Sequence, residues 1–149
     1  PRSRGLGDVY KRQVVDNGKV YVAHVGDSRA YLMQKEILNP LTTDHSYVME
    51  LVKLGTITKE EAAVHPKRNI ITRAVGIKDT VETDMTIVPV EKGDLLLLCT
   101  DGLSGMLSDE EMAQMLRQKE SVKRKAEKLV ETANLRGGYD NISLILIEI

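Results

Sequence analysis

Three aspartates of this chain each stand close to a glycine at one end of an apolar, strand-like run: Asp27, Asp101 and Asp140. A carboxylate at a strand end can hold a hard cation at the rim of a sheet, and a nearby glycine lets another group approach closely. Because the three aspartates lie far apart in the sequence, we expect a sheet fold that brings them into one polar site. Such a site is typical of metal-assisted chemistry on an oxygen-rich substrate.

Each aspartate also has a simpler interpretation. Asp27 lies in a Gly-Asp-Ser sequence that is ordinary in hairpin turns, and Asp101 can cap the N-terminus of a helix. Asp140 can shape the turn into the last strand. If all three simpler interpretations held, the placement of an aspartate at each of three strand ends would be a coincidence. A shared site explains that placement, and we favour it for this reason.

Composition sets broad bounds on the function. The 149 residues, 42% of them hydrophobic, suit one domain with a sizeable core, and a net charge of -1 gives no reason to expect nucleic-acid binding. The single cysteine, Cys99, excludes an internal disulfide and is typical of a reducing compartment. No apolar run approaches the about 20 residues of a membrane span, and no secretory signal is visible. We therefore expect a cytoplasmic monomer without membrane contacts.

Residues 1–13 differ in character from the rest of the chain. They are basic, contain glycine and lack a periodic apolar face, and their end resembles the translation of an adapter used in sequencing libraries. We expect this segment to be non-native and to make no specific packing contacts, and residues 14–149 to be the C-terminal part of a single domain. The alternative is a genuine disordered basic N-terminus.

From residue 14 onward, strand-like and helix-like patterns predict an α+β fold. The first two strand-like runs flank Gly-Asp-Ser and are predicted to pair as a hairpin. The run at 95–99 is apolar on both parities, which is typical of a strand buried on both faces. Capping boxes begin helices after Thr58 and Ser108. The predicted strands are 20–25, 29–34, 81–90, 95–99 and 141–149. The predicted helices are 47–54, 58–64, one that opens at the Ser108 capping box and carries Met112, Met115 and Leu116, and one that carries the apolar positions from Val122 to Ala133.

The remaining chemistry-bearing residues are weaker candidates. The three histidines lack metal-ligand spacing; His24 fits a buried position, and His65 lies in a polar insertion that could form a flap over substrate. Arg29 can pair with one of the aspartates, with a phosphate, or in an ordinary surface ion pair. Cys99 lies within a buried strand, so packing is favoured over a nucleophilic role.

Five short segments occur in a characteristic order and spacing: 25–31 (VGDSRAY), 41–46 (LTTDHS), 68–76 (RNIITRAVG), 98–103 (LCTDGL) and 138–143 (GYDNIS). Together they resemble the metal-dependent protein serine/threonine phosphatases of the protein phosphatase 2C family, in its bacterial branch. The resemblance implies the C-terminal portion of a four-layer αββα sandwich with a two-metal centre, manganese or magnesium, between the sheets. It also implies that residues 43–76 are the family's flap.

The resemblance also implies roles for individual residues. Asp101 and Asp140 match ligands of the catalytic metal pair, and Gly102 belongs to the same candidate metal site. Asp27, together with Asp101, matches a third, weaker metal site of some members. His65 and Arg73 are candidate substrate-binding residues in the flap region. The implied hydrolase acts on phosphoserine and phosphothreonine of proteins, with a serine/threonine kinase as one candidate partner.

Departures from the family pattern limit what this chain is expected to do alone. The family's early phosphate-binding arginine and its Asp-Gly-x-Gly-Gly segment, which bridges both metals, do not occur here. Gly105 stands where some relatives carry a further aspartate, which leaves the third metal site open. We therefore expect the chain alone to be a poor catalyst. The alternative function is a non-catalytic binding module whose flap recognises a phosphorylated partner, and the upstream sequence would discriminate the two.

Overall fold

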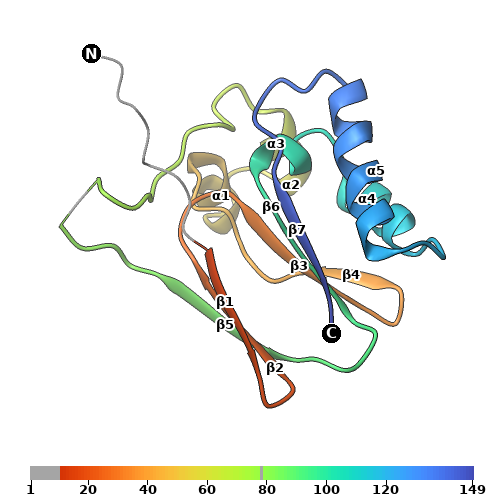
Figure 1. Cartoon of the computed structure of the whole chain (residues 1–149). Coiled ribbons are helices and arrows are strands. Elements are labelled where there is room, and N and C mark those ends of the chain that lie inside the picture. Colours follow the sequence, from red (N-terminus) through yellow and green to blue (C-terminus); the bar gives the residue numbers. More distant parts are fainter. Residues whose placement is uncertain (1–10, 78) are drawn as a thin grey trace.

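The computed structural model describes residues 11–77 and 79–149, which form two facing antiparallel sheets with helices packed on one of them (Figure 1). The first sheet has the strand order β1 (Lys11–Asp16), β2 (Lys19–His24), β5 (Asp84–Pro89). The second has the order β4 (Ile37–Pro40), β3 (Arg29–Gln34), β6 (Leu95–Cys99), β7 (Leu144–Glu148). The helices are α1 (Tyr47–Lys53), α2 (Lys59–Val64), α3 (Asp101–Ser104), α4 (Asp109–Leu116) and α5 (Val122–Leu135).

Strand β6 lies at the centre of the packing, as its uninterrupted apolar sequence predicted. All five of its residues are buried, and the strand pairs with β3 on one side and β7 on the other. Side chains alternate between faces of a strand, so β6 serves two cores. Leu96 and Leu98 pack between the sheets with Val20 and Val22, whereas Leu95, Leu97 and Cys99 pack beneath α3, α4 and α5.

Both predicted capping boxes are present. In α4, Ser108 accepts a hydrogen bond from the Glu111 backbone, and the Glu111 carboxylate accepts one from the Ser108 backbone. Thr58 and Glu61 form the same arrangement at α2. Arg136, just after α5, donates to the Glu111 carboxylate and to the carbonyl oxygen of Met106. The start of α4 is thereby joined to the end of α5.

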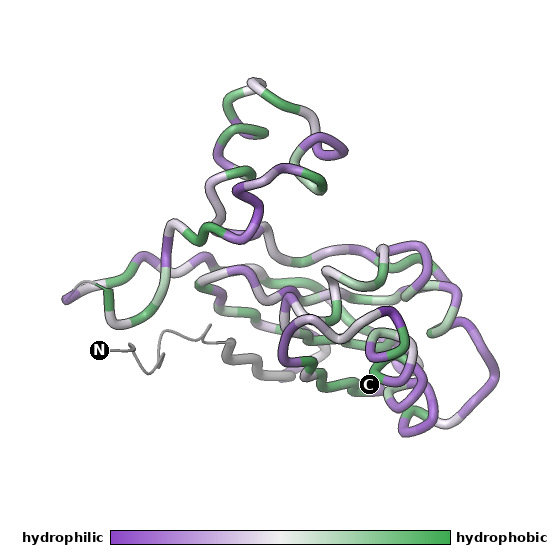
Figure 2. Tube along the Cα trace, turned by 90° about the horizontal axis from the view of Figure 1, so that it is seen from above, coloured by the Kyte–Doolittle hydropathy of each residue, from purple (hydrophilic) through white to green (hydrophobic). Residues whose placement is uncertain are grey.

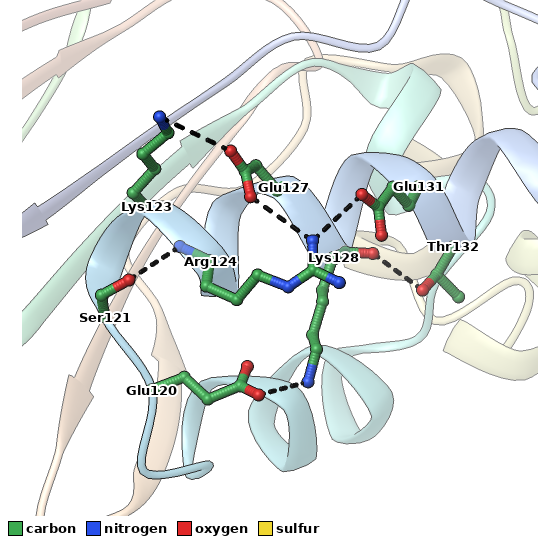
Figure 3. Close-up of polar contacts among 8 residues, drawn as sticks. All are labelled: Glu120, Ser121, Lys123, Arg124, Glu127, Lys128, Glu131 and Thr132. Atoms are coloured by element: carbon green, nitrogen blue, oxygen red, sulfur yellow. Dashed lines mark hydrogen bonds and ion pairs between the residues drawn. The ribbon is translucent and has the colours of Figure 1, made fainter.

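Helix α5 buries one stripe against the sheet and exposes a charged face. Leu129 and Ala133 are fully buried. Charged side chains on the opposite face pair with one another along the helix, and Lys128 reaches back to Glu120 at 2.6 Å (Figure 3). The pairs of Lys123 and Arg124 are exposed and add little stability, whereas the Lys128–Glu120 pair is part-buried.

The predicted hairpin between residues 20–25 and 29–34 is wrong. Strand β2 pairs with β1 and β5, whereas β3 pairs with β4 and β6, so Gly26, Asp27 and Ser28 carry the chain from one sheet to the other. The crossing lets both strands turn their apolar residues toward the same inter-sheet core. The hairpin turn before β2 is instead Asn17-Gly18, where both residues have positive φ, as a two-residue type I′ turn requires.

The expectation that residues 1–13 make no packing contacts is wrong for residues 11–13. These residues belong to β1, and Lys11, Arg12 and Gln13 pair with His24, Ala23 and Val22 of β2. The Asn17-Gly18 turn brings this segment alongside β2, and backbone pairing then needs no particular side chains. Residues 1–10 lie outside the described residues.

On the outer face of the three-stranded sheet, strand β5 exposes apolar side chains. Met85 is 63% exposed and Ile87 56%, and in register they face Ala23 and Tyr21 of β2. Strand β5 is an edge strand of this sheet that ends at Pro89, which agrees with the sequence prediction. Within the described residues the molecule therefore has helix, sheet and sheet layers, three of the four layers of the predicted sandwich (Figure 1).

The insertion between β4 and β5 stands away from this body. Seen from above, the segment that carries α1 and α2 projects from the stacked sheets and shows hydrophilic and hydrophobic residues in alternation (Figure 2). We call residues 43–76 the flap. No helix in the described part of the chain is long and apolar enough to cross a membrane.

We expect the Glu111 carboxylate to make the free energy of unfolding depend on pH in the acid range. Hydrogen bonds from Arg136, and then from Ser108, lower its pKa from the ordinary 4.5 to about 2. A group with a lowered pKa in the folded state stabilises the protein above its unfolded pKa and loses that contribution as the pH falls through the folded value. Denaturant unfolding should therefore show Glu111→Gln less stable than wild type above pH about 5, with the gap closing toward pH about 2. Arg136→Met should behave alike, and a gap independent of pH would contradict the assignment.

Candidate metal centre at the strand ends

Asp101 stands directly beyond the buried strand β6, where the first turn of α3 begins. The preceding Thr100 ties this turn to the segment before β7. Its hydroxyl donates to the carbonyl oxygen of Asn141 at 2.9 Å and accepts from the backbone N–H of Ser143 at 3.0 Å, and its own N–H donates to the Ser143 carbonyl oxygen. The Asp101 turn and the Asp140 segment are therefore held side by side.

Gly102 permits this close approach. A Cβ at this position would lie 2.4 Å from the carbonyl oxygen of Asn141 and 3.3 Å from that of Asp140. The first distance is well inside van der Waals contact, and the neighbouring atom is backbone, which cannot rotate away. Glycine is needed here for space.

The electrostatics place three aspartates in one negative field. Partial loss of hydration raises the pKa of Asp101 although the residue lies at the surface, and the charge of Asp140 raises it further. Burial also raises the pKa of the half-buried Asp27, with the charge of Asp101 as the next cause. Like charges that repel one another in this way would be stabilised by a bound cation.

The oxygen donors suit a hard divalent cation, but the side chains do not form a closed ligand set. The Asp140 carboxylate is exposed and accepts a hydrogen bond from the N–H of Asn141 at 2.7 Å. Among the described residues no three His, Cys, Asp or Glu side chains converge closely enough to hold a metal ion. Carboxylates fit Mn²⁺ or Mg²⁺ by their chemistry, and the ligand roles of Asp27, Asp101, Asp140 and Gly102 remain predictions.

Asp44 is a residue of this site that the sequence reasoning missed. It receives two hydrogen bonds from Nε of Arg29, at 3.0 and 3.2 Å, and one from Nη2 at 2.8 Å. This pairing resolves the alternatives left open for Arg29 in favour of a part-buried ion pair. The charge of Asp44 also raises the pKa values of Asp27 and Asp101, so it belongs to the same field. Its only signal in the sequence was its place in the Thr-Asp-His-Ser segment.

The two candidate substrate-binding residues have partners within and beside the flap. Nδ1 of His65 accepts the N–H of Lys67 at 3.0 Å, where α2 ends. Arg73 pairs with Asp84 at 2.8 Å and Glu82 at 3.4 Å, and lines a cavity of about 290 Å³. Both contacts are compatible with a local structural role, so substrate binding by these residues remains a prediction.

Comparison with known proteins identifies the family. Residues 12–141 match the sequence model of the family described as protein phosphatase 2C. The chain belongs to the protein phosphatase 2C family. The family resemblance drawn from the five sequence segments is thereby confirmed.

Two named relatives come from bacteria. The serine/threonine phosphatase stp of Listeria monocytogenes is 43% identical over 144 residues, which cover 97% of this chain and 57% of that protein. The protein phosphatase PhpP of Streptococcus pneumoniae is 43% identical over 145 residues, covering 97% and 58%. The chain thus spans a little over half the length of the curated relatives it matches.

Solved structures confirm the fold expectation. The serine/threonine phosphatase of S. agalactiae superposes with a TM-score of 0.90 at 40% identity, over 95% of this chain and 58% of that one. The catalytic domain of the phosphatase PstP in complex with two manganese ions gives a TM-score of 0.83 at 34% identity, over 94% and 57%. The described chain is therefore a part of the protein phosphatase 2C sandwich.

The crowding at Gly102 makes a testable prediction. Gly102→Ala should destabilise the fold by about 2 kcal/mol, because backbone must move to admit the methyl group. It should also speed amide exchange at Ser143, whose N–H is bonded to Thr100. Gly76→Ala is the matched control: φ is +87° and no atom lies within 4 Å of the added Cβ, so only backbone strain of about 1 kcal/mol applies. Denaturant unfolding with equal losses for both variants would refute the close-approach argument.

Proposed function

We propose that this chain carries part of the active site of a protein phosphatase that hydrolyses phosphoserine and phosphothreonine by two-metal activation of water. The observation that carries the proposal is the junction of the Asp101 and Asp140 segments through Gly102 and Thr100. Family membership and relatives named serine/threonine phosphatases support it. The PstP neighbour, described with two manganese ions, supports Mn²⁺ as a cofactor, and Mg²⁺ has the same ligand preference.

The residues of this chain would hold and shape the metal site. Asp101 and Asp140 supply anionic oxygen ligands to the metal pair, and Asp27 with Asp101 serves a weaker third position. Gly102 lets the two ligand segments meet. When bound, the two cations neutralise the phosphate dianion and lower the pKa of the attacking water. Cys99 is buried within β6 beneath the helices, so it is assigned to packing and not to attack on phosphorus.

Residues outside the metal site would meet the phosphoprotein. The flap, with His65 and Arg73, is the proposed contact surface for the protein substrate. A phosphorylated protein is the proposed substrate class, a serine/threonine kinase is one candidate, and a cytoplasmic monomer is the proposed state. The sequence contains no Asp-Gly-x-Gly-Gly segment to bridge the metals, so we propose weak turnover for these 149 residues alone.

A non-catalytic binding module remains the second candidate. It is favoured by one observation: within the described residues no three acidic, histidine or cysteine side chains form a metal-binding group. Reading the gene upstream of residue 14 separates the two candidates, since an early arginine and an Asp-Gly-x-Gly-Gly segment support the enzyme. The same reading decides whether residues 1–13 are adapter-derived.

Phosphatase activity is the direct test. Protein expressed with the upstream coding sequence restored should hydrolyse phosphoserine or phosphothreonine peptides with Mn²⁺ and stop when EDTA is added. Asp101→Asn and Asp140→Asn should each lower turnover by at least about 100-fold, because a neutral amide replaces an anionic ligand. For comparison, loss of a residue that only hydrogen-bonds to a metal ligand typically costs about 10- to 100-fold. Asp27→Asn should be milder. The 149-residue chain should show little turnover.

Cys99→Ser separates metal chemistry from thiol chemistry. Because Cys99 packs in the core, the variant should unfold at lower denaturant concentration yet keep its turnover per folded molecule. Two results would overturn the proposed mechanism. One is activity of the restored protein that survives EDTA, and the other is activity that disappears with Cys99 while the fold persists.

A further inference from the structure

His45 is the first buried residue of the flap, and every polar group it has is used. It is 4% exposed, and its ring stacks on that of His24 with centroids 4.7 Å apart. It lies next to Asp44, whose carboxylate belongs to the negative field of the candidate metal centre. The sequence analysis assigned no role to His45, because its spacing to the other histidines is not that of a metal site.

His45 holds both backbone groups of Gly26, the residue before Asp27. The Gly26 N–H donates to Nδ1 of His45 at 3.0 Å, and the His45 N–H donates to the Gly26 carbonyl oxygen at 2.8 Å. Gly26 has φ of +108°, which glycine adopts readily and L side chains rarely adopt, so the two hydrogen bonds to His45 select this conformation among those open to glycine. The orientation of the chain at Asp27 is therefore set from the flap.

The ring of His45 extends this connection to β5, the edge strand of the three-stranded sheet. Because Nδ1 accepts a backbone N–H, the ring proton is on Nε2, which donates to Oδ2 of Asp84 at 3.1 Å. The other oxygen of Asp84 accepts from Nη1 of Arg73 at 2.8 Å. One chain of hydrogen bonds thus runs from Gly26 through His45 and Asp84 to Arg73.

The same residues close the base of the flap. The carbonyl oxygen of His45 accepts the N–H of Thr72 at 2.8 Å, and Ser46 and Ile71 form an isolated antiparallel bridge. The flap leaves and rejoins the body at this point, and Arg73 follows immediately. A displacement at the flap base would alter the bonds that fix Gly26.

We propose that His45 is a positioning residue that couples the base of the flap to the loop carrying Asp27. The imidazole is suited to this role because it accepts from one element with Nδ1 and donates to another with Nε2. Through this connection a protein substrate engaging the flap would change the placement of the Asp27 carboxylate. The metal-binding consequence of the coupling rests on the proposed function, whereas the positioning itself does not.

Amide hydrogen exchange of the full 149-residue chain tests the positioning without any assay of activity. In His45→Gln the side-chain amide atoms lie about as far from the backbone as Nε2 of histidine does, so no acceptor remains at the Nδ1 position. Exchange at Gly26 should accelerate about fivefold or more, the equivalent of one ordinary hydrogen bond. In His45→Asn the side-chain oxygen takes the place of Nδ1, so exchange at Gly26 should stay near wild type.

Two further variants separate the connection from general loosening. Asp84→Ala removes the acceptor for His45 and Arg73 but touches neither Gly26 nor Asp27, and it should still accelerate exchange at Gly26. Asp84 has a partly exposed side chain, so this variant serves if His45→Gln does not fold. His65→Gln is the matched control. Nδ1 of His65 also accepts a backbone N–H within the flap, at 3.0 Å, but the donor is Lys67 and not Gly26. It should leave Gly26 unchanged.

A titration with manganese chloride tests the metal-binding consequence. The measured quantity is the paramagnetic broadening of the amide signals of Asp27 and Asp101. His45→Gln should need several-fold more Mn²⁺ than wild type and His45→Asn about the same, since the carboxylate placement follows Gly26. The positioning role is refuted if His45→Gln and Asp84→Ala leave Gly26 exchange unchanged, or if His65→Gln or His45→Asn matches His45→Gln. Wild-type protein expressed with the upstream coding sequence restored that shows no broadening, with the Gly26 responses as expected, would remove the proposed metal site and leave the positioning role standing.

Discussion

The burial of strand β6 on both faces is the constraint on which the rest of the structure depends. Leu96 and Leu98 complete the core between the sheets, and Leu95, Leu97 and Cys99 complete the core beneath the helices. Burial of this kind stabilises the fold by about 1.5 to 3 kcal/mol for each large side chain. A slip of the strand in register would therefore cost much of the stability of both cores. Because β6 is fixed in this way, Asp101 at its end is fixed too.

The candidate metal centre concentrates like charges at the end of that apolar strand. Thr100 and Gly102 hold the Asp140 segment beside Asp101. Lost hydration, and then repulsion by the charge of Asp140, raise the pKa of Asp101. Structures retain such an unfavourable arrangement at functional sites more often than elsewhere. In a protein phosphatase 2C chain, a bound divalent cation would attract these carboxylates and so offset their mutual repulsion.

The flap is connected to this centre through residues that do no chemistry in the proposed mechanism. Asp44 pairs with Arg29, and His45 fixes Gly26 and receives Thr72 at the point where the flap returns. Two adjacent flap residues, Asp44 and His45, therefore contact residues on either side of Asp27, namely Arg29 and Gly26. The residues that pack between the sheets lie outside the flap, so the flap meets the body through these polar contacts and not through the sandwich core.

The sequence by itself determined what rests on local physics: the doubly buried run at 95–99, the capping boxes at Thr58 and Ser108, and five short segments specific enough to identify the family. Tertiary structure alone decided the rest. A Gly-Asp-Ser turn has the same local chemistry whether it closes a hairpin or crosses between sheets, so the pairing of β2 with β1 was not predictable from it. Asp44 and His45 acquire their roles only from partners at least 15 residues away, since a hydrogen bond across the fold leaves no periodic trace in the sequence.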